Sequence, residues 1–357
     1  MKMNKARVGI IGCGNIGSYH LGNLKQLTDI AELVGFCDII PERAEAFVAD
    51  AGCGKAYSNY LDLLNDAKPD MVFIGIPPYC HGEIEYELLN RKIPFFVEKP
   101  LHLDIEVAKD IANKIEEIGL VTAVGFQCRY SNICEPTKEF VEKNKVSYVY
   151  CGRMSGIPSA PWWKVKELSG GQIVEQTIHN YDMIRFILGE PDEVFTMATR
   201  GLCNDLPEGF DTDELSTTVI KFKSGILGCV STGCYGRGAE AYDGSIVFSS
   251  AKSRAEHKII GSLKIYGDQP VKSEKEGGHF VKGDGNFASA SADCTLIKDD
   301  KTAGVTCDRT FIEAAMAGDT TRVLSPYRDG LKSLAFTLAC NLSIETGKPV
   351  NVDDLLK

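Results

Sequence analysis

Short apolar runs alternate with helical patterns through the first third of the chain, and this alternation constrains the fold more than any other feature. Continuous apolar strands separated by amphipathic helices are typical of a parallel sheet that is covered on both faces. The predicted strands are 7–12, 31–37, 70–76, 93–97 and 120–126, and the predicted helices include 83–89 and 105–118. We therefore expect a doubly wound α/β domain over residues 1–126, with ligand sites at the carboxyl ends of its strands.

The first predicted strand runs into a glycine-rich turn that is followed by a helical pattern. The turn reads Gly12-Cys13-Gly14-Asn15-Ile16-Gly17, which is the G-x-G-x-x-G motif in its strand-to-helix setting. Gly12 permits the tight turn, Gly14 lets the backbone approach a pyrophosphate, and Gly17 allows close packing. The helix amino terminus supplies unpaired N–H groups for phosphates. The turn predicts a dinucleotide site that includes Asn15 and Ile16, with an ordinary glycine turn as the alternative.

An acidic residue ends the second predicted strand. Asp38 follows Gly14 by the spacing at which a ribose-binding carboxylate belongs. Its charge would repel a 2′-phosphate, which favours NAD over NADP. Arg43 is close enough in sequence to bind a 2′-phosphate, so NADP stays possible. The alternative for Asp38 is an exposed residue of a turn, without a role in binding.

Further polar residues follow the later strands. Because the carboxyl ends of parallel strands meet at one edge of a sheet, these residues are expected to face one crevice. They are Ile76, Pro77, His81, Glu98, Lys99, Gln127 and Arg129. His81 has the alternative of capping the following helix, and Gln127 and Arg129 have that of joining two domains. A cationic Lys99 at a strand end, where a nicotinamide would lie, favours chemistry over packing.

The pattern changes after Tyr130. Predicted helices at 133–143, 311–323 and 326–346 accompany six predicted strands, and residues 276–293 are predicted to form a mobile loop. The strands are 146–154, 194–200, 215–222, 225–234, 243–248 and 263–266. Strands joined by short turns predict a mostly antiparallel sheet with helices on one side. We expect an α+β domain with an open-faced sheet over residues 127–357.

Residues 170–182 form the most chemically loaded segment of this second half. On one continuous helix, Glu175, His179 and Asp182 would share a stripe, and a carboxylate beside the imidazole would favour its protonated form. An ion pair at the domain seam is the alternative. Trp162 and Trp163 precede the segment and are expected to stack on a sugar face, to cover the cofactor or to fill the core.

Composition narrows the classes of function. The 357 residues carry a net charge of −10 without a basic cluster, which argues against a nucleic-acid partner. No signal-peptide pattern and no apolar stretch long enough for a membrane span is present, so we expect a cytoplasmic protein. The 13 cysteines contain no C-x-x-C pair and no zinc-like spacing, which predicts reduced thiols and no metal site.

Several motifs together resemble one enzyme family. They are Gly12-x-Gly14-x-x-Gly17, Glu98-Lys99-Pro100, Val124-Gly125-Phe126-Gln127-x-Arg129, Gly170-Gly171 followed by His179-x-x-Asp182, and Thr346-Gly347-Lys348-Pro349-Val350. In this order and spacing they are similar to the glucose-fructose oxidoreductase, inositol dehydrogenase and rhizopine-catabolism family, called Gfo/Idh/MocA. The resemblance spans the chain.

The resemblance implies a Rossmann domain that binds NAD or NADP, and a sheet domain that forms homodimers or homotetramers. It also implies reversible oxidation of a secondary alcohol on a sugar, inositol or related polyol, with Lys99 as the catalytic lysine and His179 as the acid/base. Many members carry Asp where this chain has Glu175, so Glu175 is expected to contact the substrate or to orient His179. The expected substrate contacts are Lys99, Arg129, Trp163, Glu175 and His179.

Two other functions remain open for such a chain. A member of the family can retain NAD and cleave a glycoside through transient oxidation, without net redox change. The same scaffold can also serve as a regulatory protein without catalysis. The presence of Lys99 together with His179 argues against the regulatory role, because a regulator could dispense with the catalytic lysine. Whether Lys99 or His179 acts as the base stays undecided at this level.

Overall fold

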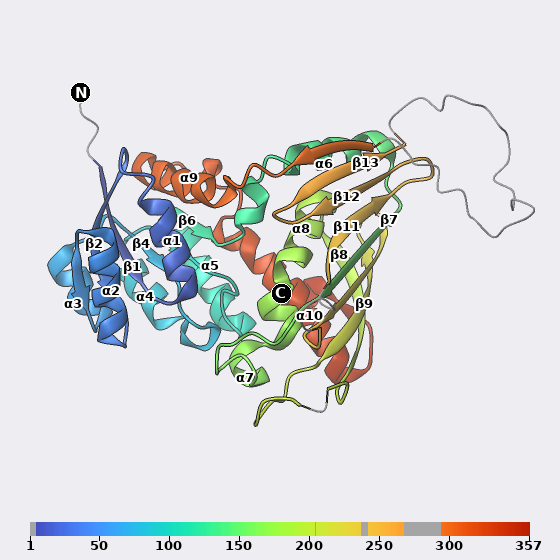
Figure 1. The fold of residues 1–357 in the computed structure, drawn as a ribbon, viewed down its shortest axis with the longest axis horizontal. Helices are drawn as coiled ribbons and strands as arrows, with labels where there is room; N and C mark the ends of the chain where they lie inside the picture. The colour runs from blue at the N-terminus through green and yellow to red at the C-terminus, as the bar shows by residue number, and fades with distance from the viewer. Residues whose placement is uncertain (1–4, 204, 237–241, 268–293) are drawn as a thin grey trace, which may run out of the picture.

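Two sheets divide the molecule, one in each half of the chain (Figure 1). The computed structural model describes residues 5–203, 205–236, 242–267 and 294–357. The predicted loop at 276–293 lies outside these residues. Within them, no helix has the length and apolar character needed to cross a membrane.

The N-terminal sheet has six parallel strands in the order β3-β2-β1-β4-β5-β6. The strands are β1 (Ala6–Ile11), β2 (Ala31–Cys37), β3 (Lys55–Tyr57), β4 (Met71–Ile74), β5 (Phe95–Val97) and β6 (Thr122–Val124). This order reverses between β1 and β4, which is where doubly wound sheets bind their ligands. The predicted Rossmann architecture is confirmed.

Helices cover both faces of this sheet because their apolar stripes pack on its apolar strands. They are α1 (Asn15–Leu24), α2 (Pro41–Ala51), α4 (Glu83–Arg91) and α5 (Ile105–Ile118), while the short α3 (Tyr60–Asp62) buries none of its residues. A helix from the other end of the chain, α9 (Ala303–Ala317), completes the same core through Phe311 and Ile312. A helix was predicted here, but its bounds of 311–323 were wrong, because α9 begins at Ala303 and stops before Gly318, which has a φ of +65°.

Among the described residues, the C-terminal sheet has nine strands in the order β14-β13-β12-β11-β7-β10-β9-β8-β15. They are β7 (Tyr148–Met154), β8 (Pro191–Thr199), β9 (Leu215–Phe222), β10 (Leu227–Gly233), β11 (Tyr242–Ser249), β12 (Arg254–Lys258), β13 (Ser262–Tyr266), β14 (Cys294–Lys298) and β15 (Val350–Asn351). All neighbours pair antiparallel except β7 and β10, which run parallel. The predicted mostly antiparallel sheet is confirmed, although β12, β14 and β15 were missed.

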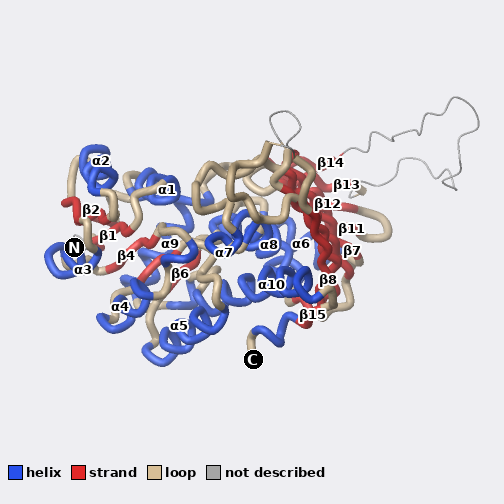
Figure 2. The backbone as a smooth tube through the Cα atoms, turned by 90° about the horizontal axis from the view of Figure 1, so that it is seen from below, coloured by secondary structure: helices blue, strands red, loops and turns tan. Residues whose placement is uncertain are grey.

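Helices pack on one face of the nine-stranded sheet, the face toward the N-terminal half (Figure 2). They are α6 (Cys134–Asn144), α8 (Ile178–Leu188) and α10 (Tyr327–Thr346), while the short α7 (Lys166–Ser169) lies beside them. No described helix covers the opposite face. Along its strands the residues that point to this open face alternate with buried ones.

The two halves of the chain also pack directly against each other. α10 contacts α5 of the N-terminal half and β8 of the C-terminal sheet. Gly330 of α10 lies so close to Val124 of β6 that a Cβ there would sit 2.7 Å from the valine side chain. A domain boundary at residue 126 stays a prediction, since α9 returns to the N-terminal core after it.

Candidate active site

The glycine turn between β1 and α1 is built as its sequence predicts. Gly12 has a φ of +95°, and a Cβ there would collide with the Gly75 carbonyl at the end of β4. A Cβ on Gly17 would collide with the carbonyl of Gly12, whereas one on Gly14 would meet nothing within 4 Å. Gly12 and Gly17 therefore shape the turn, and Gly14 leaves open space over it.

The first N–H groups of α1 face this open space. Ser18 donates to the Gly14 carbonyl at 2.9 Å, so the N–H groups of Asn15 and Ile16 precede the first bond inside the helix. Unpaired N–H groups at a helix amino terminus bind phosphate. The turn therefore fits the pyrophosphate of a dinucleotide.

Asp38 lies beside the turn at the end of β2. Its carboxylate accepts a hydrogen bond from the Cys13 N–H at 2.8 Å and another from the Ile40 N–H at 2.9 Å. Asp38 is buried rather than exposed, which rules out a solvated turn residue. Arg43 is exposed on the first turn of α2. A carboxylate fixed at this place fits a ribose diol, because each of its oxygens retains acceptor capacity.

Ile76, Pro77 and His81 follow β4 at the point where the strand order reverses. Ile76 packs against Gly12, and Ile76 and Pro77 are partly exposed. His81 is buried and its Nδ1 lies 2.6 Å from the Glu85 carboxylate, which also accepts the Gly82 N–H. His81 thus helps to fix the start of α4, and its contact with a cofactor stays a prediction.

Lys99 extends from the end of β5 to the C-terminal half. Its Nζ donates to Oε1 of Glu175 and to the Glu175 backbone carbonyl, both at 3.0 Å. The two side chains are about one-tenth exposed. An ammonium has three N–H donors, so one remains for a ligand. The structure thus joins two predicted catalytic residues across the two halves of the chain.

Glu175 is held by groups other than His179. Trp163 Nε1 donates to its Oε2 at 2.7 Å, and the Gln176 side chain donates to the same oxygen. Burial opposes ionisation of Glu175, but Lys99 and these donors outweigh it and lower the pKa of the carboxyl. Glu175 is therefore an anion that orients the Lys99 ammonium.

The predicted stripe of Glu175, His179 and Asp182 is wrong. Residues 172–176 form a π-helical turn, and α8 begins only at Ile178, so the helical register breaks between Glu175 and His179. Gly170 and Gly171, with φ of +74° and +80°, direct the chain into this turn. Asp182 points elsewhere and accepts hydrogen bonds from Arg129 and Ser333.

His179 lies on the first turn of α8 and is partly exposed, and its ring is nearly perpendicular to that of Phe126. Its Nδ1 has no hydrogen-bond partner among the described residues. Burial, and then the positive charges of Lys99 and Arg153, put the pKa of His179 well below its usual value. The sequence reading favoured an imidazolium, but the structure gives a neutral imidazole that can accept a proton.

Three other residues that were predicted to contact the substrate or the cofactor have structural partners instead. Trp163 is fully buried, so it packs in the core and donates to Glu175 instead of stacking on a substrate. Arg129 is 2% exposed and pairs with Asp182 and Asp329, which makes it a joint between elements. Glu98 is buried, and its carboxylate pairs with His20 rather than facing a cofactor. Burial inside polar networks is the common reason.

Gln127 begins a single 3-10 turn after β6 and is partly exposed. Its Oε1 is buried and has no hydrogen-bond partner in the described structure. The predicted cofactor contact of Gln127 stays a prediction. Among the described residues, no three His, Cys, Asp or Glu side chains come together in a set that would hold a metal ion.

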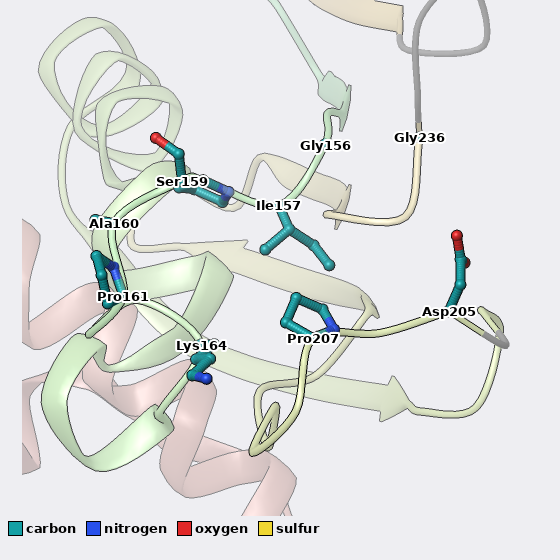
Figure 3. Close-up of a pocket in the computed structure, with 10 residues that line it drawn as sticks. Gly156, Ile157, Ser159, Ala160, Pro161, Lys164, Asp205, Pro207 and Gly236 are labelled. Atoms are coloured by element: carbon teal, nitrogen blue, oxygen red, sulfur yellow. The ribbon is translucent and has the colours of Figure 1, made fainter.

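A pocket of about 580 Å³ lies on the loops that precede and follow Trp163 (Figure 3). Ile157 and Pro207 point toward each other across it, and Lys164 lies at its edge. The Trp162 ring meets Tyr79 of the N-terminal half edge-on, with 6.4 Å between ring centroids. The tryptophan pair beside this pocket therefore contacts Tyr79 of the N-terminal half through Trp162 and Glu175 through Trp163.

Comparison with known proteins gives the family. Residues 6–126 match the oxidoreductase family with an NAD-binding Rossmann fold, and residues 116–352 match its C-terminal α/β domain. A myo-inositol 2-dehydrogenase of Thermotoga maritima is 30% identical over 70% of this chain and 74% of its own length. A scyllo-inositol 2-dehydrogenase (NAD⁺) of Bacillus subtilis is 30% identical over 73% of this chain and 78% of its own.

Solved structures agree on the fold. A putative NADPH-dependent oxidoreductase from Desulfitobacterium hafniense superposes with a TM-score of 0.81 at 17% identity, over 99% of this chain and 100% of that one. A dehydrogenase from Bordetella pertussis, solved with NADH and UDP-GlcNAcA, gives 0.78 at 20% identity over 98% and 99%. With both of its domains matched, this chain belongs to the Gfo/Idh/MocA oxidoreductases and carries their NAD-binding Rossmann domain.

Proposed function

We propose that the protein is an NAD-dependent dehydrogenase that interconverts a secondary alcohol and a ketone on an inositol, a sugar or a related polyol. The observation that carries the proposal is the contact of Lys99 with Glu175 near a neutral His179, at the same edge of the parallel sheet as the dinucleotide turn. The relatives named as inositol 2-dehydrogenases support this substrate class.

The residues of this chain divide the work of alcohol oxidation. The bound nicotinamide supplies the hydride acceptor. His179 accepts the hydroxyl proton, since its lowered pKa keeps it neutral and ready for a proton at neutral pH. Lys99 donates its remaining N–H to the same oxygen as it becomes a carbonyl, and Glu175 fixes the direction of that donor. A positioned acid/base contributes about 10²–10⁴-fold to such a step.

Lys99 as the base is the other assignment, and the geometry favours His179. Lys99 already donates hydrogen bonds to the carboxylate and to the backbone carbonyl of Glu175, which places it as a donor in the site. His179 carries no such carboxylate partner among the described residues, while two cations favour its neutral form. Proton acceptance by His179 therefore needs no disruption of an ion pair.

NAD is the proposed cofactor in preference to NADP because Asp38 places a carboxylate at the ribose position. Binding of NADH and NADPH is compared by the fluorescence of the reduced nicotinamide. Tighter binding of NADPH would contradict the assignment of Asp38.

A substrate screen tests the proposal. Inositols, monosaccharides, uronates and glycosides are each incubated with NAD and with NADP, and reduced cofactor is followed by absorbance. We expect NADH from a polyol or sugar, and a Lys99→Met variant that binds NAD but turns over roughly 10²-fold more slowly. Cleavage of a chromogenic glycoside without net NADH, or unchanged turnover in Lys99→Met, would overturn the proposal.

We also propose that the open face of the C-terminal sheet joins copies of the chain into a homodimer or homotetramer in the reducing cytoplasm. Large apolar side chains are exposed on this face: Tyr148, Tyr150, Met197, Val219 and Leu227. Neighbouring strands bring Val219 opposite Cys229, and Cys229 opposite Tyr150, so these side chains form a contiguous patch.

Light scattering after chromatography tests this interface. Val219→Glu should release monomers, whereas Ile118→Glu, an equally nonpolar exposed position on α5, should leave the assembly unchanged. A monomeric wild-type protein would contradict the proposal.

A further inference from the structure

Helix α1 carries a buried histidine that none of the roles above uses. His20 is 3% exposed, and its Nε2 lies 2.9 Å from Oε1 of Glu98. Its Nδ1 lies 3.0 Å from Oδ2 of Asp308 on α9, and Asn23 donates to the same oxygen. A buried imidazole between two buried carboxylates is therefore built into the N-terminal half.

Both ring nitrogens of His20 act as donors, because each faces a carboxylate oxygen, which is an acceptor when ionised. Burial lowers the pKa of His20, but Asp308 and Glu98 outweigh it and raise the pKa to about 10. His20 is therefore an imidazolium at neutral pH, and its charge offsets the cost of burying two anions.

The second oxygen of Glu98 reaches the catalytic strand end. Glu98 Oε2 accepts the backbone N–H of Lys99 at 3.3 Å. On its other side the carboxylate packs against Gly125, where any Cβ would collide with it. Glu98 is thus confined between His20 and Gly125, with one oxygen on the main chain of Lys99.

His20 also connects this strand end to the two helices around it. α1 begins at the phosphate-binding turn, and α9 comes from the far end of the chain. The His20 ring packs against Phe96 and Phe73 with centroid distances of 4.9 and 5.2 Å, which fixes its place between β4 and β5. Three elements therefore meet at Glu98, one residue before Lys99.

We propose that His20 and Asp308 are positioning residues that act through Glu98 to hold the Lys99 main chain, and with it the ammonium, in register with the cofactor turn and with Glu175. The proposal rests on the proposed catalytic role of Lys99. Loss of the His20 charge leaves Glu98 a buried anion without a cationic partner, which favours movement of its carboxylate toward water. Such a movement carries Oε2 away from the Lys99 N–H.

Two variants test the proposal. His20→Gln keeps a hydrogen-bond donor of similar reach and removes the positive charge. Asp308→Asn removes one of the two carboxylates that stabilise the imidazolium of His20, and it leaves Glu98 unchanged. We expect kcat to fall by about tenfold or more in His20→Gln, and less in Asp308→Asn, because a small misplacement of a catalytic group is costly. Dissociation constants for NADH, measured by fluorescence, should stay within about threefold, since the turn itself is unchanged.

Leu24→Ala is the matched control. Leu24 is buried on the same helix and contributes only packing. It should destabilise the fold through a cavity while leaving kcat near the wild-type value. Equal losses of kcat in Leu24→Ala and His20→Gln would reduce His20 to a packing residue. If His20→Gln does not fold, Asp308→Asn against Leu24→Ala decides the same question.

A Lys99→Met background separates this proposal from the proposed function. His20→Gln should cause little further loss in that background, because a positioning residue has nothing left to position. Full additivity of the two losses overturns the role of His20. Wild-type activity of Lys99→Met instead overturns the role of Lys99 itself.

Discussion

Lys99 Nζ lies 3.0 Å from both Oε1 and the backbone carbonyl of Glu175, so a cation from the end of β5 is held by a residue of the C-terminal half. The contact spans the two halves of the chain and selects one orientation for the ammonium. Trp163 and Gln176 hold the carboxylate in turn. The geometry makes Glu175 the residue that decides where the remaining Lys99 donor points.

Glu175→Gln should lower kcat by roughly 10²-fold, because an amide loses the charge that orients Lys99. The affinity for NADH should stay close to the wild-type value, since Glu175 makes no contact with the glycine turn in the described structure. Steady-state kinetics and NADH fluorescence measure the two quantities.

Glu175→Asp and Glu167→Gln serve as controls for this change. Asp restores the charge and is the residue that many family members carry here, so it should recover part of kcat. Glu167 is an exposed carboxylate on α7, and its neutralisation should have no effect. Wild-type kcat in Glu175→Gln would contradict the orienting role.

The pH dependence of alcohol oxidation should report His179. When the pH falls below the pKa of His179, the imidazole becomes protonated and can no longer accept a proton, so kcat/KM falls on the acid side. Because burial, Lys99 and Arg153 lower that pKa well below 6.5, the acid limb should lie below this value. A profile recorded from pH 5 to 9 locates the limb.

Arg153→Gln should move the acid limb to higher pH. Removing this cation stabilises the imidazolium and raises the pKa of His179. Arg309 is a partly exposed residue that pairs with Asp29, so Arg309→Gln should leave the limb in place. A limb that is unchanged in Arg153→Gln but lost in His179→Asn would show that the charge of Arg153 does not affect the pKa of His179.

The sequence pattern predicted the N-terminal half well because its strands are continuous apolar runs with a glycine motif between the first strand and its helix. It missed β12, whose sequence Arg-Ala-Glu-His-Lys buries only Ala255 and His257. It misplaced α9, whose first turns are Ala, Gly, Val, Thr and Cys and carry a weak apolar period. Tertiary packing on the N-terminal core, rather than local preference, places that helix.

The candidate site divides in the same way. Residue type and position pointed to Lys99, His179 and Asp38, each at a strand end or helix start. The partner of Glu175 was missed because the π-helical turn at 172–176 changes the register that a regular helix would give. The pair of His20 and Asp308 is separated by 288 positions in the chain, so no local spacing reveals it.

Alanine substitutions at two glycines of α1 should have different effects: one should weaken NADH binding, and the other should only stabilise the fold. A Cβ on Gly17 collides with the Gly12 carbonyl, so Gly17→Ala should shift the turn and weaken NADH binding by at least tenfold, or about 1.4 kcal/mol. Gly22 lies on the exposed side of the same helix with nothing within 4 Å of its Cβ. Gly22→Ala should raise the free energy of unfolding by about 0.5–1 kcal/mol and leave NADH binding unchanged. Equal NADH affinities in the two variants would contradict the close approach at Gly17.

The imidazolium of His20 should make the free energy of unfolding depend on alkaline pH. Its pKa is about 10 in the folded protein and near 6.5 in the unfolded chain, so the folded state retains a proton that the unfolded state loses. The stabilisation is complete below pH 6.5 and declines as the pH rises toward 10, by about 5 kcal/mol in all. Urea unfolding measures this contribution of His20 when the wild-type protein and His20→Gln are compared between pH 6.5 and 9.5. The other titrating groups are common to both proteins. A constant difference across that range would mean that His20 is neutral, with its proton on Glu98 or Asp308.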